Sequence, residues 1–188
     1  MKKYILTIDQ GTTSTRSILF DDKANIVTMN QMEIELISPH DGYIEHNPLE
    51  IWQKTYQTIQ NVLKQANVSA KEIAGIAITN QRETTLLWDK VTGQTVYNAI
   101  VWQSRQSQAI CNRLVESGYE NLIQSKTGLI INSYFSASKV LWLFENVSGV
   151  KERAFNGELY MGTIDCYLLY KLTDGRFMRL IILMPQEQ

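Results

Sequence analysis

Small hydroxyl side chains gather in the stretch DQGTTSTR (residues 9–16), between two apolar runs that are typical of β-strands. Gly11 permits a sharp turn and the close approach of a ligand. Thr12, Thr13 and Ser14 offer hydroxyl and backbone N–H groups that together can wrap a polyphosphate. The alternative is a polar hairpin in which Thr and Ser side chains cap backbone groups. The stretch alone leaves both interpretations open.

Two charged residues frame this turn. Asp9 could hold Mg²⁺ through water, because this ion keeps much of its hydration and takes one or two carboxylates. Arg16 could offset charge on a phosphoryl group in transfer. The stretch differs from the Walker loop and from GxGxxG, because those motifs place their glycines before a helix and this one enters a strand. Asp9 and Arg16 are therefore the catalytic candidates of a different kind of phosphate-binding turn.

Arg82 and Glu83 follow the apolar run at 73–79, at the carboxyl end of an expected strand. Ligands of α/β proteins bind at this end of the sheet. An arginine that donates and a glutamate that accepts can together bind the hydroxyls of a polyol. The alternative is a surface ion pair, which would contribute only about 0 to 1 kcal/mol and which the two residues alone favour.

Two aromatic residues lie in comparable places. Trp102 ends the apolar run at 99–102, and its flat face could pack on the carbon backbone of a ligand. Tyr134 precedes an expected helix and could offer its hydroxyl to a ligand. Packing inside the core is the alternative for both side chains.

These candidates need a sheet to position them. Strands are expected at 4–8, 17–20 and 26–36 as an antiparallel meander, and at 73–79 and 99–102 as buried runs covered on both faces by helices. A hairpin-like excursion around residues 89–93 separates the last two runs. The sequence thus predicts an α/β fold with a mixed five-stranded sheet and flanking helices.

The clearest expected helix follows Asn47 as N-cap and Pro48 as first helical residue. One apolar face is predicted for it, made of Leu49, Trp52, Tyr56, Ile59, Val62 and Leu63. Further helices are expected at 104–117, 136–146 and 164–172.

Composition excludes several classes of protein. The chain has 188 residues, of which 44% are hydrophobic, and 18 basic against 19 acidic residues give a net charge of −1. There is no broad electrostatic reason to bind nucleic acid or an anionic membrane. Cys111 and Cys166 stand alone, which favours a reducing cytoplasm, and neither His40 nor His46 has a triad arrangement around it. No run approaches the roughly 20 apolar residues of a membrane helix.

Six segments in order resemble the glycerol kinases of the FGGY carbohydrate kinase family: DQGTTSTR, GYIEHNPLEIW, ITNQRETTLLWD, NAIVWQSR, KTGLIINSYFSASK and GELYMGTIDCYLLYKLT. The resemblance covers residues 4 to about 176. It implies two actin-like, ribonuclease-H-like domains around a cleft. It also implies transfer of the γ-phosphoryl of ATP to glycerol, giving sn-glycerol 3-phosphate, in a cytoplasmic homodimer or homotetramer.

Carried over by position, the resemblance assigns a role to every candidate. The contacts to nucleotide phosphates are Thr12, Thr13, Ser14 and Arg16, with Asp9 near the Mg²⁺. The glycerol ligands are Arg82, Glu83 and Tyr134, with Trp102 as a wall of the glycerol pocket. The family's catalytic base and most of its adenine site belong to the second domain, so this chain by itself is expected to have little or no kinase activity. A non-catalytic module that binds polyol or phosphate, or part of another FGGY sugar kinase, are the alternatives, and NQRETT argues against the latter.

The tail RLIILMPQEQ (residues 179–188) departs from the family, which would continue with a segment similar to TDYTNASRT. The codons CGA CTG ATT ATA CTA ATG CCT CAA GAA CAA encode this tail, and the same bases read from the third one spell TDYTNASRT. We therefore expect residues 1–176 to be an incomplete N-terminal kinase domain. Residues 177–188 are expected to be an aberrant tail, with which a frameshift near residues 177 and 178 replaced the normal continuation.

Overall fold

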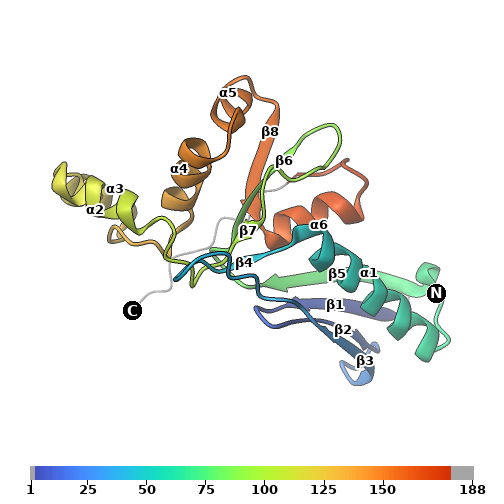
Figure 1. Ribbon diagram of the computed structural model, residues 1–188. Coiled ribbons are helices and arrows are strands. Elements are labelled where there is room, and N and C mark those ends of the chain that lie inside the picture. Colours follow the sequence, from blue (N-terminus) through green and yellow to red (C-terminus); the bar gives the residue numbers. More distant parts are fainter. Residues whose placement is uncertain (1–2, 179–188) are drawn as a thin grey trace.

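The computed structural model describes residues 3–178 and has the predicted α/β class (Figure 1). Its strands form two four-stranded sheets, in the orders β3-β2-β1-β5 and β4-β7-β6-β8. The first sheet contains β1 (Tyr4–Gln10), β2 (Ser14–Phe20), β3 (Ile26–Glu33) and β5 (Ile73–Asn80). The second contains β4 (Glu45–His46), β6 (Thr85–Asp89), β7 (Ala99–Ile100) and β8 (Leu159–Thr163).

Within the described residues, one long helix and η1 follow the first four strands, four helices follow β7, and one helix follows β8. The helices are α1 (Pro48–Gln65), the short 3₁₀ helix η1 (Ala70–Glu72), α2 (Gln108–Glu116), α3 (Glu120–Thr127), α4 (Ser136–Asn146), α5 (Val150–Phe155) and α6 (Ile164–Leu172). The helices expected at 136–146 and 164–172 are confirmed. The one expected from 104 begins only at Gln108.

The mixed sheet and its three-strand meander are confirmed, because β1 pairs antiparallel to β2 and parallel to β5. The number of strands is different. Over the described residues the sheet has four strands rather than five, because β7 pairs with β4 and β6 in the second sheet. Strand β6 leads into the excursion expected around residues 89–93, and its first four residues are buried.

Strands β3 and β5 differ from the prediction, β3 in its length and β5 in its burial. Strand β3 ends at Glu33 and not at 36, although the backbone N–H of Ile34 still donates to the carbonyl oxygen of Thr13 (2.9 Å). Strand β5 was expected to be covered on both faces, yet Ile76 is 51% exposed. Over the described residues β5 is an edge strand with β1 as its neighbour, and none of its residues is buried.

Helix α1 packs on the first sheet with a face that overlaps the predicted one in part, since Ile59 and Val62 are buried as expected (Figure 1). Leu49 and Tyr56 of the predicted face are exposed. The helix buries Thr55 and Thr58 instead, whose hydroxyls bond those of Thr15 (2.9 Å) and Ser17 on β2 (2.8 Å). An apolar pattern counts threonine as polar, so it leaves Thr55 and Thr58 out of the buried face.

The predicted start of α1 is confirmed. The side-chain oxygen of Asn47 accepts from the backbone N–H of Leu49 (2.9 Å) and of Glu50 (3.4 Å). Replacing Asn47 by Ala removes this cap, and we expect the free energy of unfolding to fall by about 1 kcal/mol. Urea titration followed by circular dichroism measures the change. Gln60→Ala, at an exposed position of the same helix, is the control, and an equal effect of the two changes would contradict the capping role.

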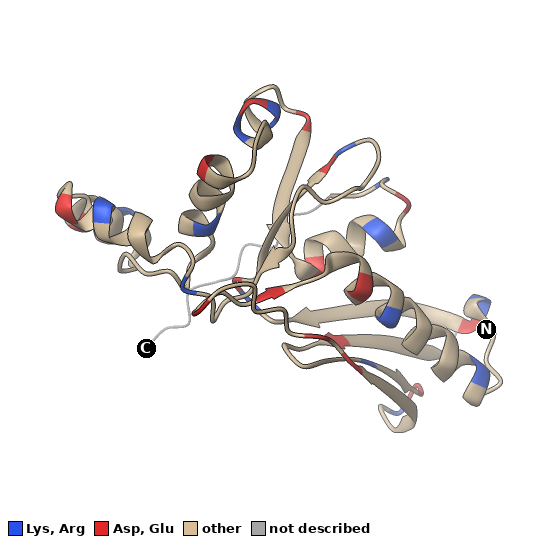
Figure 2. Ribbon diagram, viewed as in Figure 1, with Lys and Arg blue, Asp and Glu red and all other residues tan. Residues whose placement is uncertain are grey.

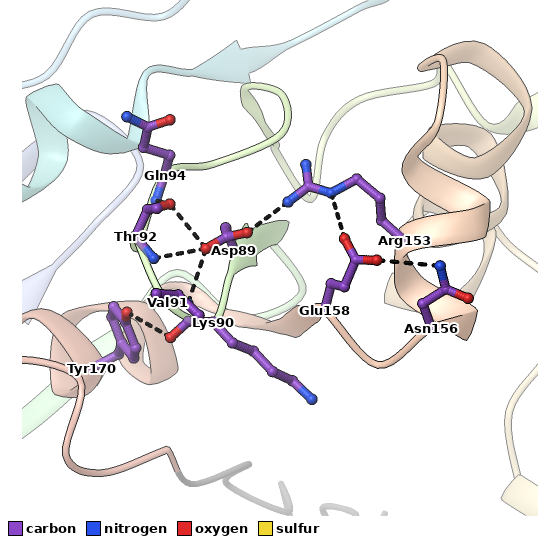
Figure 3. Close-up of polar contacts among 9 residues, drawn as sticks. All are labelled: Asp89, Lys90, Val91, Thr92, Gln94, Arg153, Asn156, Glu158 and Tyr170. Carbon is purple, nitrogen blue, oxygen red and sulfur yellow. Dashed lines mark hydrogen bonds and ion pairs between the residues drawn. The ribbon is translucent and has the colours of Figure 1, made fainter.

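A turn follows β6, where the hairpin-like excursion around residues 89–93 was predicted, and Asp89 organises it (Figure 3). One carboxylate oxygen of Asp89 accepts from the backbone N–H groups of Val91 (2.9 Å) and Thr92 (2.7 Å), and the other from the guanidinium of Arg153 (2.7 Å). These hydrogen bonds, led by that of Thr92, lower the pKa of the Asp89 carboxyl. Arg153 also pairs with Glu158 (3.2 Å), so this network ties β6 to α5 and β8.

Charges of both signs are interspersed along the helices, as on α1 and α5 (Figure 2). This agrees with the balanced composition. Across the described part of the chain, no helix combines the length and the apolar character needed to cross a membrane.

Candidate active site

A polar cavity of about 290 Å³ opens where β1 and β5 end. These two strands are parallel and in register, with Gln10 beside Asn80, so their carboxyl ends meet at one edge of the sheet. The cavity is lined by Asp9, Gln10, Gly11, Thr12, Asn80, Gln81, Arg82, Trp102 and Tyr134.

The cavity brings the two predicted corners together. Asp9 and Thr12 line it from the hydroxyl-rich turn, and Arg82 and Tyr134 line it from the other side. The indole N–H of Trp102 donates to the hydroxyl of Thr12 (2.9 Å), which joins the two corners directly. Residues far apart in the sequence therefore share one crevice.

The hydroxyl-rich turn is tight. The backbone N–H of Gly11 donates to the carbonyl oxygen of Ser14 (2.9 Å), which closes the turn between β1 and β2. Thr13 is exposed at its tip, and neither Thr13 nor Ser14 lines the cavity. Of the residues in this turn, Gly11 and Thr12 line the cavity.

Asp9 and Arg16 occupy paired positions on β1 and β2. The Arg16 guanidinium lies 4.0 Å from the Asp9 carboxylate, and both side chains are more than one-third exposed. Arg16 does not line the cavity, whereas Asp9 does. Within residues 3–178 no three His, Cys, Asp or Glu side chains cluster as a metal site, and among these residues Asp9 is the one Asp or Glu that lines the cavity. A single carboxylate suits Mg²⁺ that keeps its waters.

Arg82 and Glu83 have different surroundings: Arg82 lines the cavity, and Glu83 bonds to Ser136. Arg82 is exposed and lines the cavity, and among the described residues it forms no ion pair, so the surface-pair interpretation is wrong. Glu83 does not line the cavity. One of its carboxylate oxygens accepts from the backbone N–H (2.9 Å) and the hydroxyl of Ser136 (2.7 Å), which caps the start of α4.

The two aromatic candidates contact each other at the cavity. The rings of Trp102 and Tyr134 lie edge to face, with 5.9 Å between their centroids. Both are only partly buried, so neither is a core residue. They form a wall on which the carbon atoms of a small ligand can pack.

Sequence reasoning missed a buried amide network beneath the cavity. The side-chain amide of Gln81 donates to the side chain of Gln10 (3.2 Å) and to the carbonyl oxygen of Gly11 (3.2 Å). The hydroxyl of Thr84 donates to Gln81 (3.0 Å) and accepts from the backbone N–H of Trp102 (3.3 Å). The missed signal is that Gln10 and Gln81 both stand at the ends of adjacent parallel strands. Their network fixes the two corners relative to each other.

An α/β domain with a hydroxyl-rich turn and a polar crevice at the ends of parallel strands belongs to the class of small-ligand-binding domains. Comparison with known proteins identifies a family within this class. The model of the FGGY family of carbohydrate kinases, N-terminal domain, matches residues 4–179. The chain therefore belongs to the FGGY family of carbohydrate kinases.

The chain is also similar to individual kinases. The chain is 53% identical to the glycerol kinases of Xanthomonas campestris pv. campestris and of Listeria monocytogenes over 175 residues, which are 93% of this chain and 35% of each relative. The structure of Plasmodium falciparum glycerol kinase with ADP matches with a TM-score of 0.84 and 36% identity, over 92% of this chain and 34% of that one.

A xylulose kinase from Lactobacillus acidophilus matches with a TM-score of 0.76 at 24% identity, over 90% of this chain and 33% of that chain. This likeness shows the fold alone. The fold is the actin-like, ribonuclease-H-like one of the FGGY kinases, as predicted. The chain spans about a third of the length of the relatives it matches.

Proposed function

We propose that this chain is the glycerol-side part of a glycerol kinase, which as a whole transfers the γ-phosphoryl of ATP to glycerol and gives sn-glycerol 3-phosphate. The observation that carries the proposal is the single cavity with Asp9 and Thr12 on one side and Arg82 and Tyr134 on the other. The 53% identity to glycerol kinases, and the ADP in the Plasmodium falciparum glycerol kinase structure, support this choice of donor and acceptor.

On this proposal the hydroxyl-rich turn, of which Asp9 and Thr12 line the cavity, and the residues around Arg82 have separate roles. Thr12, Thr13, Ser14 and Arg16 contact the nucleotide phosphates, and Asp9 holds Mg²⁺ through water. The guanidinium of Arg82 and the hydroxyl of Tyr134 bind glycerol hydroxyls, while Trp102 packs on its carbon atoms. Glu83 does not line the cavity, and we assign it the role of accepting a glycerol hydroxyl through Oε1, the oxygen that Ser136 does not bond.

This chain by itself is expected to turn over slowly or not at all. Phosphoryl transfer requires donor, metal and acceptor to be held in line inside a closed cleft. The described residues supply one side of such a cleft. Glycerol titration by calorimetry, beside a coupled assay of ATP consumption, tests both statements. Binding without turnover is the expected result, and rapid turnover would contradict the second statement.

The polyol assignment has its own control. Xylulose and gluconate, titrated under the same conditions, represent the sugars of the other family members. Tighter binding of either than of glycerol would favour another FGGY kinase. A chain that binds neither glycerol nor these sugars would contradict the polyol site.

We also propose that residues 1–176 form an N-terminal kinase domain that is incomplete at its C-terminal side, and that 177–188 are a frameshifted tail. One set of codons can encode RLIILMPQEQ in one frame and TDYTNASRT in a shifted frame, which supports this proposal. Residues 179–188 lie outside the described residues. Sequencing of the coding DNA tests it, and codons that do not spell TDYTNASRT in the shifted frame would refute it.

A further inference from the structure

Lys139, on the first turns of α4, is a buried lysine that the proposed reaction does not use. Its side chain is 0% exposed. Its ammonium group donates a hydrogen bond to the carbonyl oxygen of Tyr134, in the loop that precedes the helix. The hydroxyl of Ser138, next to it on α4, is bonded to Ser107 (2.9 Å) and is not its partner.

A buried ammonium needs compensation, because its desolvation is costly. Burial lowers the pKa of Lys139 to about 8, while the negative charge of Glu83 and, to a smaller extent, Cys111 on α2 act in the opposite direction. Burial is the larger effect. The surroundings of Lys139 therefore disfavour its charge overall, and stability alone does not explain a lysine at this position.

Glu83 also needs an explanation. Its φ angle of +64° lies in the left-handed region, which is unfavourable for residues other than glycine. Such a conformation persists when its surroundings fix it. Two hydrogen bonds from Ser136 and the positive charge of Lys139 act on the Glu83 carboxylate from the same turn of α4.

Lys139 thus acts on two of the proposed glycerol ligands. It holds the backbone of Tyr134 by a hydrogen bond, and its charge attracts the Glu83 carboxylate although the two groups, both in the described part of the chain, form no ion pair. We propose that Lys139 is a positioning residue of the polyol site, which sets Glu83 and Tyr134 in place from the first turns of α4. This inference rests on the proposed function, since it assumes that these two residues meet a polyol.

Lys139→Met tests the proposal, because methionine fills a similar volume without the charge. We expect the glycerol affinity, measured by calorimetry, to fall about tenfold or more, because Glu83 and Tyr134, once released, must be ordered when glycerol binds. The melting temperature should stay the same or rise, since a disfavoured buried charge is removed. Lys151→Met on the exposed surface of α5 is the matched control and should change neither quantity.

A role in packing alone predicts the opposite pattern. A marked drop in melting temperature, with a glycerol affinity equal to that of the unmodified chain, would overturn the proposal. So would unchanged values of both quantities.

Failure of the proposed function is distinguishable from failure of this inference. If the unmodified chain binds no glycerol, the polyol site fails. Hydrogen exchange at the Ser136 amide, which donates to Glu83, then decides the role of Lys139. Faster exchange in Lys139→Met than in Lys151→Met, with both variants folded, supports positioning, and equal exchange overturns it.

The lowered pKa gives an independent check on the burial of the charge. Between about pH 8 and the ordinary lysine pKa of 10.5, the unfolded chain binds a proton at Lys139 that the folded chain has released. The free energy of unfolding should therefore rise with pH through this window. In urea titrations this contribution should be present in the unmodified chain and absent from Lys139→Met. Identical pH profiles of the two chains would show that the ammonium is not buried, and would overturn the proposal.

Discussion

Replacing Arg82 by Ala is expected to weaken glycerol binding by about 10- to 100-fold, because hydrogen bonds from a charged donor contribute roughly 1.5–3 kcal/mol. Arg82 lines the cavity from the end of β5. Its side chain is exposed and has no ion-pair partner among the described residues, so its removal should leave the free energy of unfolding unchanged. Calorimetric titration with glycerol measures the affinity, and urea titration measures the stability.

Two further variants sharpen this test. Arg82→Lys keeps the charge and loses the planar pair of donors, so it should bind glycerol more weakly than the unmodified chain and more tightly than Arg82→Ala. Arg113→Ala removes an exposed arginine on α2 that pairs with Glu145 and is the control for net charge. If Arg82→Ala binds glycerol as well as Arg113→Ala does, Arg82 is not a ligand.

Replacing Trp88 by Ala is expected to lower the free energy of unfolding by about 3–5 kcal/mol. Trp88 on β6 is 0% exposed, and its ring packs against those of Tyr160, Tyr167 and Tyr170 at centroid distances of 6.0, 5.3 and 5.8 Å. The packing extends to Gly162, where an added Cβ would lie 3.1 Å from the Trp88 ring. A cavity left in so dense a site cannot close without moving several rings.

Denaturant unfolding, followed by circular dichroism, measures this loss. Phe155→Ala is the aromatic control, because Phe155 is 77% exposed and its replacement should change the free energy of unfolding by about 0.5 kcal/mol or less. A similar small loss in Trp88→Ala would mean that the second sheet does not depend on this cluster. Since a loss of this size can unfold a marginally stable domain, an unfolded variant agrees with the prediction.

The first sheet and its helix follow from local signals. The apolar runs before and after the hydroxyl-rich turn predict β1 and β2, and Asn47 with Pro48 predicts the start of α1. Capping and strand periodicity act between residues that are close in the sequence, so they can be recognised there. The resemblance to the FGGY kinases then extended these local predictions to the fold and family, which the comparisons confirm.

The candidate site was predicted as a set of residues and not as an arrangement. The sequence singled out Asp9, Thr12, Arg82, Trp102 and Tyr134, and the structure places all of them around one cavity. The sequence did not show that Trp102 bonds to Thr12, or that the side-chain amides of Gln10 and Gln81 bond to each other at the same cavity. Their roles in catalysis and binding stay predictions until the variants are measured.

By itself, the sequence determined the elements that depend on near neighbours: the meander, the start of α1 and the polar residues at the strand ends. The tertiary structure decided which of these elements meet. It buried Thr55 and Thr58 against β2, and it turned Glu83 towards Ser136, 53 residues further along the chain. Such contacts form only when separate elements pack together. Propensity and periodicity describe one element at a time, and therefore contain no information about them.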